Sequence, residues 1–507
     1  MKNIFKIALV LSILSCALAC TKGFEDINKN PNAAESVNAS YYMTKVITLS
    51  SYQYDKQNFQ SLPALVCRYV TKLNNADDDG FNWGANEWDT WYQTLSICKS
   101  FYDQAVKEGN EALQAVAEIL AVFNWDYVTS CWGDCPYTEA LQSLGSGLVY
   151  PKYDKQSDIY PDLLSRLAAA NDILARTSST IPADSDILYG GNKVQWQKFC
   201  NSLRLRMLLK ASKNLSSAAA DIKTIAGNKS QYPVFESNAD AAEIPYNAQN
   251  LYFSGPTNGG LKTDQFKEYI KRRPSKEIID YMLPREDPRL AALFDKVRTP
   301  ELCTRDHNEY IGCPIALKTP YTYNGGQDGV QGCISTYCEA KFYQDLNDYV
   351  KAAMMIYPEV CFILSEAVNN MGASVPGETA ESLYNKGVKA SCEYWGVDDA
   401  VAVNAFLAKP AVKFDGTQKR ILEQKWVSCI IKSAETWSDY RRTNDVIGFN
   451  AQLGGGLDES ALALRQKFIP YRYIYPDNER SYNNEQYQAG IKVFGADEIN
   501  TKMWLFK

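Results

Sequence analysis

Aromatic side chains in two loop-rich segments are the residues of this sequence best suited to bind a ligand. Trp83 lies in the segment 74–92, and Tyr321 and Tyr323 occupy alternate positions in the segment 232–349. Sugar rings present apolar C–H faces beside hydroxyl groups, so flat aromatic rings near polar side chains suit them chemically. The sequence therefore predicts a carbohydrate site that uses Trp83, Tyr321 and Tyr323.

Packing is the competing interpretation for the same aromatic residues. Trp88, Trp91 and Tyr92 are spaced three and four apart, which is typical of a helix that buries one face. For these three rings we expect a packing role, and Trp83 is the better platform because Asn82 and Gly84 flank it.

The sequence contains few of the residue patterns that known catalytic sites require. His307 is the only histidine, which excludes a His-rich metal site and leaves one imidazole base. No serine-hydrolase elbow, zinc-protease HExxH, dinucleotide-binding GxGxxG or P-loop motif occurs. The 59 acidic residues leave a pair of glycosidase carboxylates open as an alternative. We predict that the protein is not an enzyme.

Charge and acidic residues argue against two further kinds of ligand. The net charge is −6 and no long basic run occurs, so nucleic acid is not expected to bind. Asp77, Asp78 and Asp79 could ligate calcium, but the spaced ligands and closing Glu of an EF-hand loop are absent. We predict a solvated turn and no cofactor, with structural calcium as the alternative.

The N-terminus has the pattern of an export signal. Lys2 and Lys6 precede an apolar run from Ile7 to Ala19, which is too short to span a bilayer. The run ends in Ala17-Leu18-Ala19-Cys20, which resembles a bacterial lipobox, with Ile13-Leu14-Ser15-Cys16 as a weaker competitor. We predict a signal peptide at 1–19, lipidation at Cys20 and a tether over 20–45, and an ordinary secretory signal with a free Cys20 is the alternative. Loss of residues 1–19 would change the net charge from −6 to −8.

Nine of the other cysteines fall into two groups. One group lies in helical patterns, where a buried thiol that behaves as a small apolar side chain is expected: Cys98, Cys200, Cys361, Cys392 and Cys429. The other group lies in a Gly-rich, turn-rich segment, where an oxidising compartment could pair its members without the sequence fixing the connectivity: Cys303, Cys313, Cys333 and Cys338. Cys131 and Cys135 could also bridge.

Helical periodicity dominates the elements that must position these residues. Apolar residues recur at three and four over 113–127, 163–174 and 196–207. Pro358 suits a first helical position and Gly372 suits the end of the same helix. Residues 380–395 have the length and the Tyr, Ala and Gly content of a tetratricopeptide-like unit. We predict an all-α helical array of such helix pairs in one domain over 46–507, with loop-rich, ligand-facing insertions at 74–92 and 232–349.

A series of short motifs in a fixed order resembles the SusD/RagB family of outer-membrane nutrient-binding lipoproteins, in particular its SusD-like branch. The motifs are Gly23-Phe24-Glu25-Asp26-Ile27-Asn28, Trp132-Gly133-Asp134-Cys135-Pro136-Tyr137, Asp287-Pro288-Arg289, Glu435-Thr436-Trp437-Ser438-Asp439-Tyr440-Arg441-Arg442-Thr443 and Ile469-Pro470-Tyr471-Arg472. We expect these motifs to build the scaffold, since Gly133 and Pro136 can end a helix, and Arg441 and Arg442 can satisfy terminal carbonyls.

The resemblance implies a lipid-anchored protein of the outer membrane that faces the cell surface. It further implies capture of glycans or peptides for a SusC-like TonB-dependent barrel transporter. Because the family takes its ligand contacts from variable loops, the resemblance assigns no individual contact. Our leading hypothesis is a non-enzymatic glycan-binding protein. The alternatives are an oligopeptide-binding partner of the same transporter, an all-α glycosidase and a pure assembly adaptor.

Overall fold

A computed structural model of the chain describes residues 37–60, 62–73, 78, 81, 83–142, 146–245, 272–315, 317, 319–326, 332–338, 341, 351–430, 432–449 and 470–507. The predicted signal peptide at 1–19 and the predicted lipidation site Cys20 lie outside these residues. Residues 39–507 form one compact unit.

Helices make up most of this unit, which confirms the predicted all-α class. They are α3 (Ala39–Gln60), α4 (Leu62–Val66), α6 (Asp89–Lys107), α7 (Glu111–Trp132), α9 (Gln156–Arg176), α10 (Lys193–Lys210), α11 (Ala218–Gly227), α13 (Lys276–Met282), α14 (Leu290–Leu293), α16 (Tyr357–Met371), α17 (Ala380–Tyr394), α18 (Ala400–Ala408), α19 (Gln418–Ser428), α20 (Ser433–Arg442), α22 (Asp477–Tyr482) and α23 (Asn484–Phe494).

The described strands are short and form two-stranded antiparallel pairs. The pairs are β1 (Val70–Lys72) with β5 (Arg272–Pro274), β2 (Cys135–Pro136) with β3 (Tyr153–Asp154), β4 (Ala242–Pro245) with β8 (Lys351–Met355), and β6 (Phe294–Asp295) with β7 (Thr336–Tyr337). Short 3-10 turns are η1 (Asn238–Asp240), η2 (Leu283–Arg285), η3 (Pro300–Leu302), η4 (Pro320–Gly325) and η6 (Trp504–Phe506).

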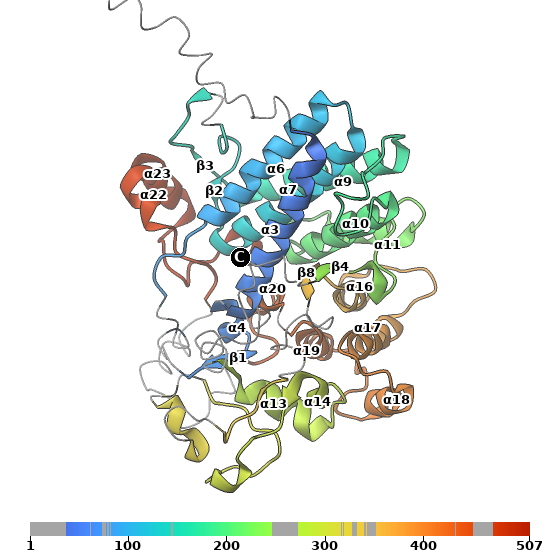
Figure 1. Cartoon of the computed structure of the whole chain (residues 1–507), viewed down its shortest axis with the longest axis vertical. Helices are drawn as coiled ribbons and strands as arrows, with labels where there is room; N and C mark the ends of the chain where they lie inside the picture. Colours follow the sequence, from blue (N-terminus) through green and yellow to red (C-terminus); the bar gives the residue numbers. More distant parts are fainter. Residues whose placement is uncertain are drawn as a thin grey trace, which may run out of the picture. The chain divides into compact units, whose positions relative to one another are not determined.

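The helices pack in series, each against the next along the chain. Figure 1 shows α6, α7, α9 and α10 side by side, followed by α16, α17 and α18 lower in the view. At the pair α16 and α17, a Cβ atom on Gly387 would lie 2.8 Å from the Phe362 ring, so a larger residue there would force this ring to shift. This pair confirms the tetratricopeptide-like unit predicted over 380–395.

Capping residues explain where several helices begin and end. The Asn110 side chain accepts a hydrogen bond from the Leu113 amide at 3.0 Å and so begins α7. Pro358 lies in the first turn of α16, and Gly372 follows its last residue with φ of +66°, as the sequence predicted. The predicted tether is too long, because α3 begins at Ala39 and not after residue 45.

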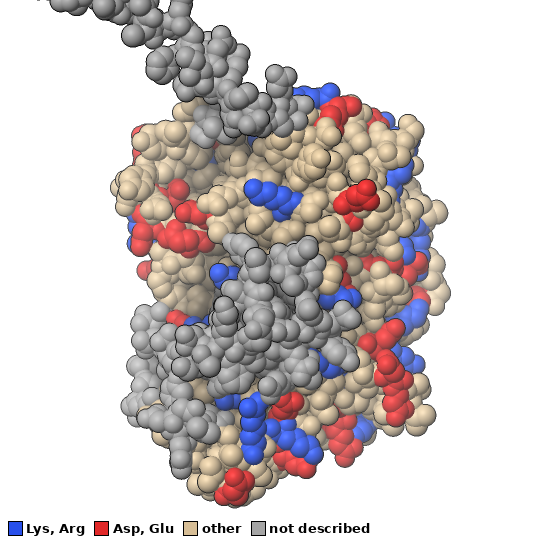
Figure 2. All heavy atoms as spheres, viewed as in Figure 1, with Lys and Arg blue, Asp and Glu red and all other residues tan. Residues whose placement is uncertain are grey.

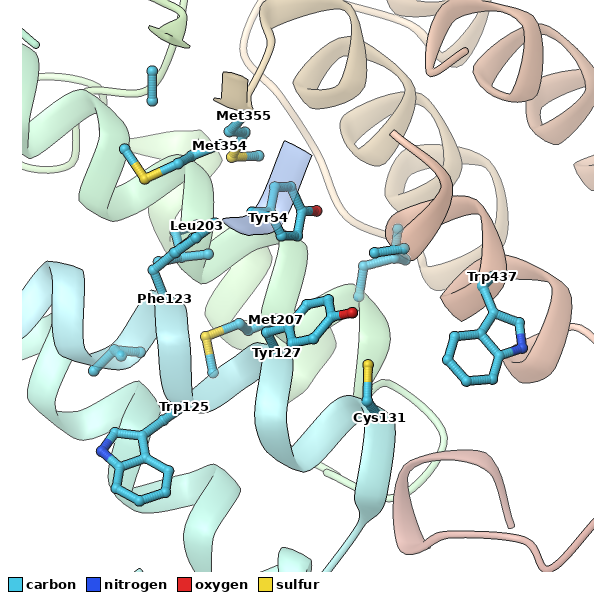
Figure 3. Packing of buried hydrophobic residues seen from close by; sticks show 14 of the residues in the cluster. Tyr54, Phe123, Trp125, Tyr127, Cys131, Leu203, Met207, Met354, Met355 and Trp437 are labelled. Carbon is cyan, nitrogen blue, oxygen red and sulfur yellow. The ribbon is translucent and has the colours of Figure 1, made fainter. Parts of the chain in front are cut away.

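One large apolar cluster joins helices that are far apart in the sequence. Figure 3 shows Tyr54 of α3, Phe123 and Tyr127 of α7, Met207 of α10 and Trp437 of α20 among its members. The Tyr54 ring meets the Phe123 ring edge to face, with centroids 5.0 Å apart. Burial of many such rings gives the scaffold its main stabilisation.

Ion pairs cross the same interior between helices. The Arg206 guanidinium on α10 donates to both Glu359 oxygens on α16, at 2.6 and 2.7 Å, and both side chains are at most 3% exposed. Lys210 donates to Asp126 at 2.8 Å and lies 3.4 Å from Glu435. Removing either member of such a pair would leave an uncompensated buried charge.

The C-terminal segment completes the core. The Tyr473 amide donates to the Cys131 carbonyl at 2.8 Å, near the end of α7. The Leu505 amide in η6 donates to the Gln156 side chain at 3.0 Å, at the start of α9. The Phe506 ring lies 4.2 Å from the Arg441 guanidinium carbon. The last residues thus contact helices from the first third of the chain.

The family motifs within the described residues contribute to the scaffold, whereas the motif at 23–28 lies outside these residues. Arg442 differs from its prediction, because it pairs with the Glu366 and Asp439 carboxylates and not with terminal carbonyls. Gly133 ends α7 with φ of +88°, where a Cβ atom would lie 2.6 Å from Phe494. Arg441 donates to the Ser130 carbonyl at 2.6 Å and to the Tyr471 carbonyl at 2.9 Å. Cys131 and Cys135, between which a bridge was possible, are both free thiols. The five cysteines of the helical group are buried free thiols, as expected.

Candidate ligand-binding region

Trp83 is a packing residue in this structure, which corrects its prediction as a ligand platform. Its side chain is 7% exposed, and its Nε1 donates to the Asp78 carbonyl at 3.1 Å. The rings of Phe81, Trp437 and Tyr473 surround it with centroids 5.6 to 6.2 Å away. A sugar cannot stack on a ring whose faces are already covered by protein.

The other aromatic residues of the segment 74–92 also pack, as expected. Trp88 is 4% exposed and directly precedes α6, so the predicted loop ends earlier than residue 92. Trp91 is stacked on Tyr127 with centroids 3.9 Å apart.

Tyr321 and Tyr323 lie in η4, where the chain breaks from helical geometry at Tyr323. The Tyr321 side chain lies outside the described part of the structure, so its ligand role stays a prediction. Tyr323 is half-buried and packs against two small apolar clusters. Burial raises the pKa of Tyr323, and the nearby Lys276 ammonium opposes this rise. Part of the Tyr323 ring therefore stays exposed to solvent, and the rest of the side chain packs against the two clusters.

Asn324 holds this turn against the preceding segment. Its Oδ1 accepts hydrogen bonds from the Arg305 and Asp306 amides, both at 2.8 Å, and its Nδ2 donates to the Asp306 carbonyl at 2.9 Å and the Cys333 carbonyl at 3.2 Å. Asn324 is 1% exposed and has φ of +56°, which Asn tolerates better than most residues. The residue was not among the predicted site residues, although the pair Asn324-Gly325 is a turn signal that could have indicated it.

The segment 232–349 contains more regular structure than the predicted loop-rich insertion. It includes α13, α14, β4 to β7 and four of the 3-10 turns. Ser275, which directly precedes α13, connects this segment to an earlier part of the chain, because its Oγ donates to the Arg68 carbonyl at 2.5 Å. Short elements and turns thus set the position of Tyr323.

The Glu277 carboxylate, which lies in α13, is buried beside the Arg68 guanidinium. Burial raises the pKa of Glu277, although Arg68 lies 3.8 Å away and lowers it. Both side chains are buried, so the Glu277 carboxyl faces the Arg68 guanidinium inside the protein.

The part of the chain that the structure describes contains no candidate metal site. No cluster of three or more Cys, His, Asp and Glu side chains among these residues could hold an ion. Of the predicted acidic turn, Asp77 and Asp79 lie outside the described residues, and Asp78 pairs with Lys72.

The face of the molecule in Figure 2 carries mixed charge. Basic and acidic side chains are interspersed over its described part, rather than gathered into one sign. Such a surface suits a neutral ligand better than a polyanion. Among the described helices, none is sufficiently long and apolar to cross a bilayer.

Comparisons with known proteins agree with this architecture. A family model described as starch-binding and associating with the outer membrane, the SusD-like model, matches residues 31–476. A comparison with curated protein sequences finds none that matches.

Solved structures with the same fold cover nearly the whole chain. A SusD homolog from Bacteroides fragilis has a TM-score of 0.74 and 24% identity, covering 93% of this chain and 100% of its own. An outer membrane protein of Bacteroides vulgatus, described in connection with nutrient binding, has a TM-score of 0.75 and 23% identity with the same coverage. A chitin-binding protein has a TM-score of 0.74 and 22% identity, covering 92% of this chain and 99% of its own. With the family model matched over most of its length, the chain belongs to the SusD-like family.

Proposed function

We propose that this protein is a non-enzymatic, lipid-anchored binding protein of the outer membrane that captures glycans at the cell surface. It would deliver them to a SusC-like TonB-dependent transporter. The observation that carries the proposal is the match of residues 31–476 to a family described as starch-binding and outer-membrane associated. The name of the structurally similar chitin-binding protein supports a glycan over a peptide.

Weak binding by a few aromatic rings is sufficient for this role. Covering half of one aromatic ring buries on the order of 100 Å², which is worth about 2–3 kcal/mol. Two or three rings, after the cost of association, give roughly millimolar to micromolar affinity. Tethering beside a transporter raises the effective concentration, so this affinity would support capture.

Tyr323 is the described residue through which we test glycan binding. Because Tyr323 is half-buried and offers only part of a ring, we expect Tyr323→Ala to weaken binding of a glycan identified on an array by about tenfold, or about 1.4 kcal/mol. Tyr323→Phe keeps the ring and should bind within about threefold of the wild type. Isothermal titration of the mature protein measures both.

Tyr482 provides the matched control for this experiment. It is 75% exposed on α22, outside the loop-rich segment, so Tyr482→Ala should leave binding unchanged. Saturable peptide binding without glycan binding would favour the oligopeptide alternative. Release of reducing ends by the purified protein would contradict the non-enzymatic role.

A Cys20→Ala variant tests the membrane attachment, and purification of the wild type tests the transporter partnership. We expect Cys20→Ala to move the protein from the outer-membrane fraction to the soluble fraction, since lipid would be its anchor. Fractionation followed by immunoblotting measures the change, and affinity purification of the wild type from membranes should retain the transporter. Membrane retention of the Cys20→Ala protein would contradict lipidation at this residue.

A further inference from the structure

Two cysteines meet inside the loop-rich segment although 29 residues separate them in the sequence. Cys303 directly follows η3 and is 7% exposed, while Cys333 precedes β7 and is fully buried. Together with Val297 and Ile311 they form one small apolar cluster, and the Tyr323 ring packs against it. The fold therefore brings these two cysteines together.

The two thiols point at the same atom. Each Sγ donates to the Thr299 carbonyl oxygen at 3.7 Å. Burial and the neighbouring Cys333 raise the pKa of Cys303 to about 11. The two sulfur atoms thus lie around one carbonyl oxygen, within one small cluster.

The backbones that carry the two cysteines are joined as well. The Arg298 and Thr299 amides both donate to the Gly332 carbonyl, at 3.0 and 3.2 Å. A Cβ atom at Gly332 would lie 1.9 Å from the Thr299 Oγ1, which shows how closely the two segments approach. A disulfide requires such an approach, with Cα atoms about 5.5–6 Å apart.

The other two cysteines of this segment lie in different surroundings. The Cys313 Sγ donates to the Pro314 carbonyl at 3.5 Å and packs with Leu73 and Ile334. Cys338 is half-buried beyond β7, and its amide donates to the Leu293 carbonyl at 2.8 Å. Neither belongs to the small cluster that holds Cys303 and Cys333.

We propose that Cys303 and Cys333, which carry thiols in this structure, form a disulfide bond when the chain folds after export. The thiolate of one cysteine attacks an oxidant of the disulfide class, such as a periplasmic thiol oxidant, and forms a mixed disulfide. The second thiolate then attacks the sulfur of the first cysteine and displaces the oxidant sulfur. The two cysteines give up two electrons and two protons, and the oxidant disulfide takes up the same number to become two thiols. Because burial disfavours the Cys303 thiolate in the folded protein, the exchange takes place before the loop closes.

The bond would enclose residues 304–332 and with them η4. It would add a covalent restraint to the turn that Asn324 already holds, at the base of Tyr323. The inference rests on the export step of the proposed function, but not on the nature of the ligand.

Peptide mapping tests the proposal on the full exported chain. The protein is alkylated under denaturing conditions without reductant and digested with trypsin, which separates Cys303 on residues 299–305 from Cys333 and Cys338 on residues 319–341. We expect a linked species of these two peptides that disappears on reduction, with loss of alkylation at both cysteines. Cys333→Ser should abolish the linked species and Cys338→Ser should retain it. Alkylation of both cysteines in the unreduced sample, or a link from Cys303 to Cys313 or Cys338, would overturn the proposal.

A second sample separates failure of export from failure of pairing. The reduced, unfolded chain is refolded with oxidised glutathione as the disulfide oxidant, and the same linked peptides are expected. If the refolded chain forms another pair or none, the pairing is refuted independently of export. A link in the refolded sample alone would contradict the bond in the exported protein and, with it, the oxidising compartment.

Discussion

Glu359→Ala is expected to lower the free energy of unfolding by about 3–5 kcal/mol, because it leaves a buried guanidinium without its main partner. Arg206 donates two hydrogen bonds to Glu359 from a position that is 3% exposed. Glu435 lies 3.7 Å from Arg206 and can compensate only in part. Urea denaturation of the mature protein measures the loss.

The exposed pair between Lys99 and Asp103 on α6 supplies the control. These side chains lie 2.7 Å apart but are each 48% exposed, so Asp103→Ala should cost less than about 1 kcal/mol. Equal losses of stability in the two variants would show that burial of the ion pair does not determine the cost of breaking it.

Acid should destabilise the protein through Glu435. Burial alone would raise the pKa of Glu435, but Lys210, Arg206 and Lys425 outweigh burial and lower it from 4.5 to about 2. A lowered pKa in the folded state means that the stabilisation is present above the unfolded pKa and is lost as the pH falls towards the folded one. Between about pH 6 and about pH 2, we expect Glu435 to account for a loss on the order of 3 kcal/mol.

A comparison of pH profiles isolates this carboxylate from the others. Glu435→Gln cannot ionise, so its unfolding free energy should lie below that of the wild type near neutral pH and approach it in acid. Glu485→Gln, at an exposed position of α23, should follow the wild-type profile. A constant difference between the wild type and Glu435→Gln at all pH values would contradict the lowered pKa.

Local signals in the sequence were sufficient to predict the helical array. Pro358 and Gly372 mark the two ends of α16, and apolar periodicity predicts α7 and α10, because the physics of caps and amphipathic faces acts within a few turns. Gly133 ends α7 for the same reason.

The candidate site depends on contacts that no local pattern reveals. Trp83 is flanked by small and polar residues, yet Trp437 and Tyr473 cover it from distant parts of the chain. The partner of Glu359 likewise follows only from how α10 crosses α16. Asn324 combines both cases, since its turn is local but its bond to the Cys333 carbonyl is not.

The contacts of the C-terminal segment constrain when the protein can fold. Synthesis proceeds from the N-terminus, and domains usually fold as units once their residues are available. In this chain α7 and α9 are made early, but Tyr473, Leu505 and Phe506 must arrive before the ends of these helices and the Arg441 guanidinium are covered. Deletion of residues 473–507 would therefore leave the ends of α7 and α9 and the Arg441 guanidinium uncovered and expose an incomplete interior.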